Sequence, residues 1–301
     1  MTVTEEILQL KKEKDAVILA HYYTRPEIQQ IADYTGDSFK LSKIAADLPN
    51  PVMVYCGVSF MGESAYLLSP DKKVLMPDMT ADCPMAHMVL KKEVEEMRKQ
   101  YEDLAVVCYI NSTAEIKSWS DVSVTSANAV TIVRNLPNKN ILFIPDKNLG
   151  SFVKAQVPEK NVMLVEGYCP IHEVISEKET CALKEAHPEA EVAVHPECNE
   201  AVNAVADYIG STAGILNHVA KSDKKEWIIG TEVGVQYELE RQNPDKVFYF
   251  PETLPVCTDM KLITLEKVRD VLKEENHRAF VAEEHVEKAK KTLDKMLELA
   301  Q

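Results

Sequence analysis

The chain has 301 residues, of which 46% are hydrophobic and 27% are charged, within the ordinary range for a soluble globular protein. Its net charge of −14 argues against a general binder of nucleic acids or membrane surfaces, although a local pocket can still be positive. The N-terminus reads as a charged amphipathic helix rather than a signal peptide, and no apolar run approaches ~20 residues. We therefore expect a cytoplasmic protein whose seven cysteines are thiols or metal ligands rather than a disulfide framework.

Four apolar runs in the first part of the chain predict the strands of a small sheet. They begin at residues 16, 34, 51 and 73, and helical patterns such as 59–69 lie between them. Runs rich in Val and Ile without polar alternation are typical of parallel strands that are buried on both faces. This segment is therefore predicted to be an α/β unit.

The same order of elements recurs twice. Strand candidates begin at residues 104, 121, 141 and 161 and again at 191, 206, 227 and 246, with helical patterns at 113–119, 127–136, 147–156, 198–205 and 234–243. The period is near 87 residues, which is too long for a solenoid, so we interpret it as domain triplication. Periodicity by chance is the weaker interpretation, because all four strands recur at this spacing. The predicted fold class is α/β, with units at 1–83, 84–169 and 170–257.

The tail, residues 258–301, differs from the three units. Residues 261–275 and 286–300 carry apolar side chains at helical spacing and predict two amphipathic helices. We expect both helices to pack, with the N-terminal helix, against the first unit and so to bring the chain ends together.

Three cysteines occupy matching places in the repeat. Cys83, Cys169 and Cys257 each follow a predicted strand by a few residues, at the edge where open α/β sheets place their chemistry. Soft thiolates select zinc, Cu(I) or iron–sulfur clusters, and closely spaced cysteine pairs typical of structural zinc are absent from the sequence. Three isolated thiolates could hold a cubane cluster with one open iron, which would act as a Lewis acid. From the residues alone, zinc and iron both stay open.

The remaining cysteines and two histidines have less specific settings. Cys56, Cys108 and Cys181 read as small buried hydrophobic residues, whereas Cys198 lies beside Glu197 without a counterpart in the other units. His87 and His172 follow cysteines by four and three residues and are candidate extra ligands or hydrogen-bond donors. An ordinary polar contact is the commoner role for such a histidine.

Polar residues also recur at matching positions after the first and second strands of each unit. They are His21-Tyr22-Tyr23, Tyr109-Ile110-Asn111 and His195-Pro196-Glu197 after the first strands, and Ser38, Ser126 and Ser211-Thr212 after the second. Each serine is predicted to open a helix, where free backbone N–H groups bind anions. Three such helix starts would suit a small substrate with several carboxylates or a phosphate; plain helix capping is the alternative.

Taken together, these motifs resemble the quinolinate synthase family along essentially the whole chain. The matching stretches are HYY at 21–23, GDS at 36–38, Cys83-Pro84, YINST at 109–113, TSANAV at 125–130, PDKNLG at 145–150, CPIH at 169–172, HPEC at 195–198, GST at 210–212, GTE at 230–232 and Cys257. One departure is Tyr22, where many members have asparagine; it should leave Tyr23 in place while altering the wall behind it. The cysteine pairs that serve some members as a redox switch are absent from the sequence.

The resemblance implies three homologous three-layer α/β/α domains with pseudo-threefold symmetry around a central active site. It implies a [4Fe-4S] cluster held by Cys83, Cys169 and Cys257, and condensation of iminosuccinate (iminoaspartate) with dihydroxyacetone phosphate to give quinolinate, phosphate and water for NAD biosynthesis. An aspartate oxidase or dehydrogenase that makes iminosuccinate is a candidate partner for a transient hand-over. Catalytic roles fall on Tyr23, Glu197 and His195. Substrate contacts fall on His21, Ser38, Tyr109, Ile110, Asn111, Ser126, His172, His195, Pro196, Glu197, Ser211 and Thr212.

Two other classes of function are compatible with the residues. A zinc hydrolase would use the Cys and His ligands with Glu197 as its base, and a non-enzymatic protein would carry the cluster as a redox or iron sensor. The metal content separates the first from a cluster enzyme, and activity with the two substrates separates an enzyme from a sensor.

Overall fold

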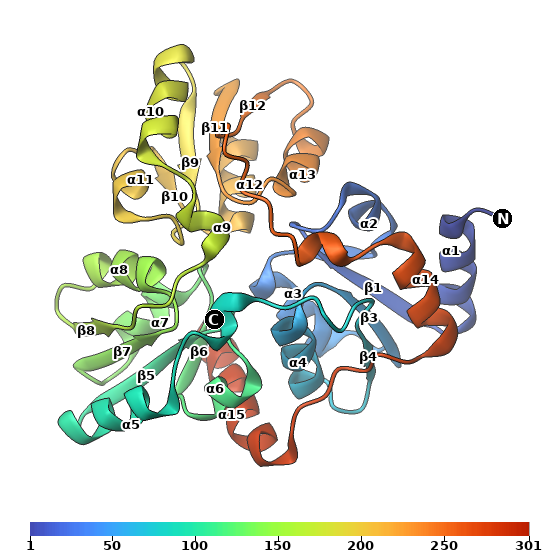
Figure 1. Ribbon diagram of the computed structural model, residues 1–301, viewed down its shortest axis with the longest axis horizontal. Coiled ribbons are helices and arrows are strands. Elements are labelled where there is room, and N and C mark those ends of the chain that lie inside the picture. Colours follow the sequence, from blue (N-terminus) through green and yellow to red (C-terminus); the bar gives the residue numbers. More distant parts are fainter. Residues whose placement is uncertain (301) are drawn as a thin grey trace.

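Three parallel sheets of four strands each organise the chain in the computed structural model, which describes residues 1–300 (Figure 1). In every sheet the first strand of the unit lies between the second and the third, and the fourth lies outside the third. The strands are β1 (Ala16–His21), β2 (Tyr34–Gly36), β3 (Val52–Cys56) and β4 (Lys73–Leu75); β5 (Leu104–Tyr109), β6 (Val122–Val124), β7 (Asn140–Ile144) and β8 (Asn161–Leu164); and β9 (Glu191–Val194), β10 (Tyr208–Ile209), β11 (Glu226–Gly230) and β12 (Val247–Tyr249). All twelve predicted strands and the α/β fold class are therefore confirmed.

The central strands have the burial that their composition predicts. Every residue of β1, β3 and β5 is buried, because helices lie between consecutive strands and cover the sheets. These helices are α1 (Val3–Glu13), α2 (Pro26–Ile31), α3 (Ser38–Asp47) and α4 (Ser59–Leu68); α5 (Lys91–Gln100), α6 (Ala114–Ser118), α7 (Ala129–Asn135) and α8 (Lys147–Gln156); and α10 (Glu177–Ala186), α11 (Glu200–Ala204), α12 (Thr212–Lys221) and α13 (Val235–Gln242). Across residues 1–300, no helix is both long and apolar enough to cross a membrane.

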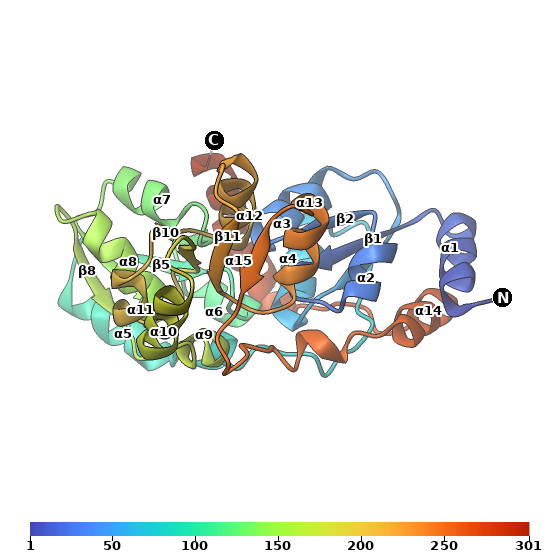
Figure 2. The ribbon, with the colours of Figure 1, turned by 90° about the horizontal axis from the view of Figure 1, so that it is seen from above.

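The two tail helices pack on different units. Helix α14 (Leu265–Glu274) lies beside α1 and against β3 of the first unit, as expected (Figures 1 and 2). Helix α15 (Glu283–Leu299) instead lies mainly against α6 and β6 of the second unit, with a smaller contact to α4. The buried side chains of Thr292 and Ser123 share a hydrogen bond of 2.8 Å at this contact.

The expectation that both tail helices pack on the first unit is therefore corrected for α15. An amphipathic pattern shows that a helix buries one face, but it does not show which surface receives that face. The chain ends consequently lie apart, with α1 at one end of the molecule and the end of α15 near the centre of Figure 1. The boundaries at residues 83, 169 and 257 stay a prediction.

A short helical turn follows each of the three repeat-related cysteines. Cys83 precedes the 3-10 helix η1 (Pro84–His87), Cys169 precedes α9 (Pro170–Glu173), and Cys257 lies three residues before the 3-10 helix η2 (Met260–Leu262). Gly167, close to Cys169, has no positive φ; a Cβ there would lie 2.4 Å from the carbonyl oxygen of Pro145. The glycine is thus needed for close backbone approach rather than for a turn.

Candidate active site

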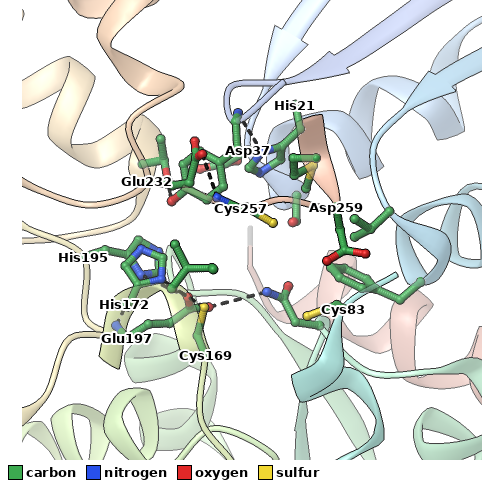
Figure 3. A pocket seen from close by; sticks show the side chains of 18 of the residues that line it. His21, Asp37, Cys83, Cys169, His172, His195, Glu197, Glu232, Cys257 and Asp259 are labelled. Carbon is green, nitrogen blue, oxygen red and sulfur yellow. Dashed lines mark hydrogen bonds and ion pairs between the residues drawn. The ribbon is translucent and has the colours of Figure 1, made fainter. Parts of the chain in front are cut away.

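One pocket lies where the carboxyl ends of strands from all three sheets meet. It holds about 1020 Å³ of space including its mouth, and Figure 3 shows side chains from all three units around it. Its lining includes Cys83, Cys169 and Cys257 together with His21, Tyr23, Ser38, Tyr109, Asn111, Ser126, His172, His195, Glu197 and Thr212. Residues as far apart in the sequence as His21 and Cys257 therefore share one cavity, while Lys and Arg are absent from its described lining.

The three pocket cysteines differ from the other four. Cys83, Cys169 and Cys257 are free thiols whose sulfur atoms face the cavity in Figure 3. Burial raises the pKa of all three thiols, that of Cys257 to about 11. Thiols that hold their protons at neutral pH are weak nucleophiles, but a bound metal displaces the proton. The setting therefore suits metal ligands better than nucleophiles.

The other four cysteines lie outside the described pocket lining. Cys56 and Cys108 are buried within β3 and β5, and Cys181 lies in α10. The thiol of Cys198 is buried and donates to the carbonyl oxygen of Gly230 at 3.3 Å. Proximity of Cys198 to Glu197 in sequence therefore reflects an ordinary packing role.

The donor set fits an iron–sulfur cluster. Three soft thiols, one from each unit, face a cavity without forming a disulfide, which is the ligand chemistry that iron–sulfur clusters require. A second grouping is also present, since donor atoms of Cys169, His172 and Glu197 lie within 4.8 Å of one another. This grouping would suit a zinc ion, so metal and sulfide analysis is the measurement that separates the two assignments.

His21 and His195 occupy matching places and carry matching hydrogen bonds. The backbone N–H of Tyr23 donates to Nδ1 of His21 at 3.1 Å, and that of Glu197 donates to Nδ1 of His195 at 3.2 Å. Burial lowers the pKa of each imidazole to about 3, so both are neutral near pH 7. A neutral ring that accepts at Nδ1 carries its proton at Nε2. Both rings therefore present an N–H donor, and that of His195 lies 3.1 Å from Oγ of Ser126.

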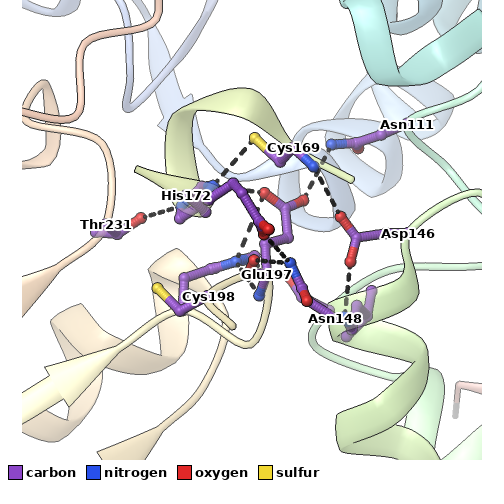
Figure 4. A network of polar contacts seen from close by, with 12 residues as sticks. Asn111, Asp146, Asn148, Cys169, His172, Glu197, Cys198 and Thr231 are labelled. Atoms are coloured by element: carbon purple, nitrogen blue, oxygen red, sulfur yellow. Dashed lines mark hydrogen bonds and ion pairs between the residues drawn. The ribbon is translucent and has the colours of Figure 1, made fainter. Parts of the chain in front are cut away.

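A chain of hydrogen bonds connects Glu197 to Tyr23, and Figure 4 shows the part of it from Glu197 through His172 to Thr231. Nδ1 of His172 lies 2.7 Å from Oε2 of Glu197 and 3.2 Å from Sγ of Cys169. Nε2 of the same ring lies 2.9 Å from Oγ1 of Thr231. The Thr231 hydroxyl in turn lies 2.7 Å from the Tyr23 hydroxyl, which also contacts Oγ1 of Thr212 at 2.7 Å. Because a carboxylate only accepts, Nδ1 of His172 donates to it, and Nε2 accepts from Thr231.

The two ends of this chain are held in opposite protonation states. Burial, with the charge of Glu197, raises the pKa of Tyr23 well above its ordinary value. Burial opposes ionisation of Glu197, but the adjacent His172 and the hydrogen bonds from His172 and Tyr109 lower its pKa. An ionised carboxylate and a protonated phenol thus lie at the ends of one hydrogen-bonded chain, as a general acid–base pair requires.

Asn111 presents a buried acceptor to the pocket. Its Nδ2 lies 3.4 Å from Oε1 of Glu197, whereas its Oδ1 has no hydrogen-bond partner among residues 1–300. Such an acceptor costs about 1–3 kcal/mol when left unsatisfied. A substrate group that donates a hydrogen bond would satisfy it.

Not every predicted contact reaches the pocket. Ile110, Pro196 and Ser211 lie outside the described lining, so their roles as substrate contacts stay predictions. His87 is half exposed and lies 2.7 Å from Asp82 by its Nε2 atom, an ordinary surface contact.

The predicted serine caps are correct in only one unit. Ser211 caps α12, whereas Asp37 caps α3 with Ser38 as its first helical residue, and Asn128 precedes α7. Local sequence places a helix start within a few residues but does not decide which side chain caps it.

Several residues at the site were not predicted from the sequence. Thr231, Asp146 and Glu232 follow the third strands of the second and third units and are fully buried. A signal for them was present in the sequence, because each is a polar residue just after an apolar strand, in GTE at 230–232 or PDKNLG at 145–150. Asp259 of the tail also lines the pocket.

The chain is similar to known proteins along nearly its whole length. A family model described as "Quinolinate synthetase A protein" matches residues 5–298. The chain is 53% identical over 294 residues to the quinolinate synthase of Caldicellulosiruptor bescii, covering 98% of this chain and 97% of that protein. It is 51% identical to the one from Caldicellulosiruptor saccharolyticus, covering 99% and 98% of the two chains. For the quinolinate synthase of Clostridioides difficile the identity is 48%, covering 99% and 98%.

Proposed function

Because the chain belongs to the quinolinate synthase family, we propose that it condenses iminosuccinate with dihydroxyacetone phosphate and releases quinolinate, phosphate and water. The observation that carries the proposal is one pocket that combines three thiols, neutral donors and a hydrogen-bonded acid–base chain. A sensor protein would need the thiols but not the acid–base chain.

Cys83, Cys169 and Cys257 would hold a [4Fe-4S] cluster in this pocket. When bound, a cluster with three protein ligands supplies an open iron that acts as a Lewis acid in dehydration. The remaining pocket residues are then free to bind and protonate the organic substrates.

The substrate carboxylates would bind to the neutral donors of the wall. The Nε2–H groups of His21 and His195 and the hydroxyl groups of Ser38 and Ser126 supply hydrogen bonds without a competing cation. Asn111 Oδ1 would accept from the imine nitrogen or from a hydroxyl group. The pocket thus orients both reactants before any proton moves.

Tyr23 would hold and move protons at its hydroxyl oxygen. Thr231 accepts from Tyr23 and donates to Nε2 of His172, whose Nδ1 donates to Glu197. A proton leaving Tyr23 can therefore pass to His172, where the Glu197 carboxylate stabilises the resulting charge. The same chain returns the proton, so Tyr23 can serve as a base in one step and an acid in the next.

The test is an anaerobic preparation of the full chain assayed with both substrates. We expect a brown protein that contains iron and sulfide and forms quinolinate, detected by chromatography, only when iminosuccinate and dihydroxyacetone phosphate are both present. A colourless protein with stoichiometric zinc, or a cluster protein inactive with both substrates, would contradict the proposal.

Substrate affinity supplies a second, narrower prediction. Ser126→Ala removes the hydroxyl beside His195, and Thr212→Ala removes one beside Tyr23. Loss of a pocket hydrogen bond worth about 0.5–1.5 kcal/mol should raise KM roughly 2- to 13-fold while iron content stays unchanged. Steady-state kinetics checks this, with Ser151→Ala on the exposed part of α8 as the control. An unchanged KM in both pocket variants would refute the assigned contacts.

A further inference from the structure

The backbone N–H of each pocket cysteine donates to a carboxylate. Cys83 N–H donates to Oδ1 of Asp82 at 2.8 Å, Cys169 N–H to Oδ2 of Asp146 at 3.2 Å, and Cys257 N–H to Oε1 of Glu232 at 3.0 Å. Figure 4 shows the contact between Cys169 and Asp146, and Figure 3 labels Glu232 beside Cys257. The same contact thus occurs once in each unit.

We propose that Asp82, Asp146 and Glu232 are positioning residues that fix the three cysteines and keep the potential of the bound cluster low. This inference rests on the proposed function, because it concerns residues that would surround the cluster. The three carboxylates act through the cysteine backbone and do not replace the thiols as ligands.

Two of the carboxylates are themselves rigidly held. Asp146 is fully buried after β7, and its Oδ1 accepts the N–H of Leu149 at 2.7 Å, which caps α8. Glu232 is fully buried after β11; its Oε2 accepts the N–H of Gly234 at 2.7 Å, and its Oε1 lies 2.8 Å from Nζ of Lys261. Each cysteine loop is therefore fastened to the end of the third strand of its sheet.

The first unit makes this contact by a different route. Val58 occupies the place after β3 that Asp146 and Glu232 occupy after β7 and β11. The acceptor is instead Asp82, which is held by the Ser59 hydroxyl and by Nε2 of His87 at 2.7 Å. If the contact were only a by-product of the repeated fold, the residue at position 58 would make it. Because Asp82 makes it instead, we infer that the cysteine N–H needs a carboxyl partner.

The chemical consequence concerns the electrostatic setting of the cluster. Hydrogen bonds donated to cluster sulfurs raise the reduction potential. Carboxyl oxygens that occupy the three cysteine N–H groups keep these donors away from the cluster sulfurs. The lack of these hydrogen bonds disfavours reduction, which suits a cluster that serves as a Lewis acid rather than an electron carrier.

The test uses the anaerobic holoenzyme and alanine variants. Asp146→Ala and Glu232→Ala remove the oxygen that accepts the cysteine N–H, so we expect a wild-type iron and sulfide content with a higher midpoint potential in each. The potential is measured by a redox titration followed by electron paramagnetic resonance. Asp82→Ala should raise the potential least, because the N–H of Cys83 at this half-exposed position can donate to water instead.

Matched controls come from a second set of carboxylates in the same units. Asp121 accepts the backbone N–H of Val106 at 2.7 Å, and Asp207 accepts that of Val192 at 2.9 Å, both near the opposite ends of the sheets from the cysteines. Asp121→Ala and Asp207→Ala should lower the melting temperature without moving the potential. A structural role alone would leave the potential unmoved in every variant.

The outcomes separate this inference from the proposed function. A cluster-free wild-type protein would refute the proposed function, whereas fully loaded Asp146→Ala and Glu232→Ala proteins with the wild-type potential would overturn only this inference. Should a buried variant fail to fold, Asp82→Ala supplies the measurement, with a smaller rise expected, and an unmoved potential there would overturn the inference.

Discussion

Replacing Cys83, Cys169 or Cys257 with alanine is expected to remove most of the bound iron and to abolish quinolinate formation. Each thiol lies on the pocket wall in a different unit, so no neighbouring cysteine within the described residues can take its place. Loss of an outer-shell partner alone costs roughly 10- to 100-fold in metal affinity or activity, and loss of a ligand should exceed that range. Iron and sulfide analysis of anaerobic protein measures the effect.

The protein carries its own controls for this experiment. Cys56, Cys108 and Cys181 lie outside the described pocket lining, in β3, β5 and α10. Their alanine variants should retain the full iron content, although removal of the buried Cys56 or Cys108 sulfur should lower stability modestly. Loss of iron from any of these three variants would show that the ligand assignment is wrong.

Tyr23→Phe is expected to lower kcat by about 10²- to 10⁴-fold, the usual contribution of a positioned acid–base group. The substitution removes the hydroxyl that contacts Thr231 and Thr212 but leaves the ring and the backbone N–H bonded to His21. Iron content and KM should therefore stay near the wild-type values. Single-turnover kinetics on cluster-loaded protein checks whether the chemical step itself is slowed.

The adjacent tyrosine is a matched control. Tyr22 is buried in a cluster with Ala193 and Trp227 of the third unit and lies outside the described pocket lining. Its hydroxyl lies 3.4 Å from Nζ of Lys40, so Tyr22→Phe should affect packing slightly and kcat little. If Tyr23→Phe and Tyr22→Phe had the same kcat, the acid–base role would belong to a residue other than Tyr23.

The pattern of apolar residues along the chain was sufficient to predict the strands and helices and their threefold repetition. Runs such as Val52–Cys56 and Leu104–Tyr109 are apolar at every position, and a strand with that pattern can only be buried on both faces. The recurrence of Cys83, Cys169 and Cys257 after predicted strands also distinguishes three of the seven cysteines by sequence alone. Periodicity and strand ends are local properties, so they can be read from neighbours in the chain.

Tertiary structure decided which surfaces and side chains meet. An amphipathic pattern predicted α15 but not its position against α6 and β6, because many surfaces can bury the same apolar face. Thr231 joined the acid–base chain only because β11 ends beside His172 and Tyr23, which lie 59 and 208 residues away in sequence. The carboxylate partner of Cys83 likewise came from Asp82 rather than from the repeat-equivalent Val58.

The sequence by itself thus determined three parallel α/β units and three candidate thiols, because burial pattern and spacing are encoded locally. The tertiary structure decided that these thiols share one cavity and that Thr231, Asp146 and Glu232 support the site. The physical reason is that hydrogen bonds between the ends of different strands depend on how the three sheets are placed relative to one another, and no local pattern records that placement.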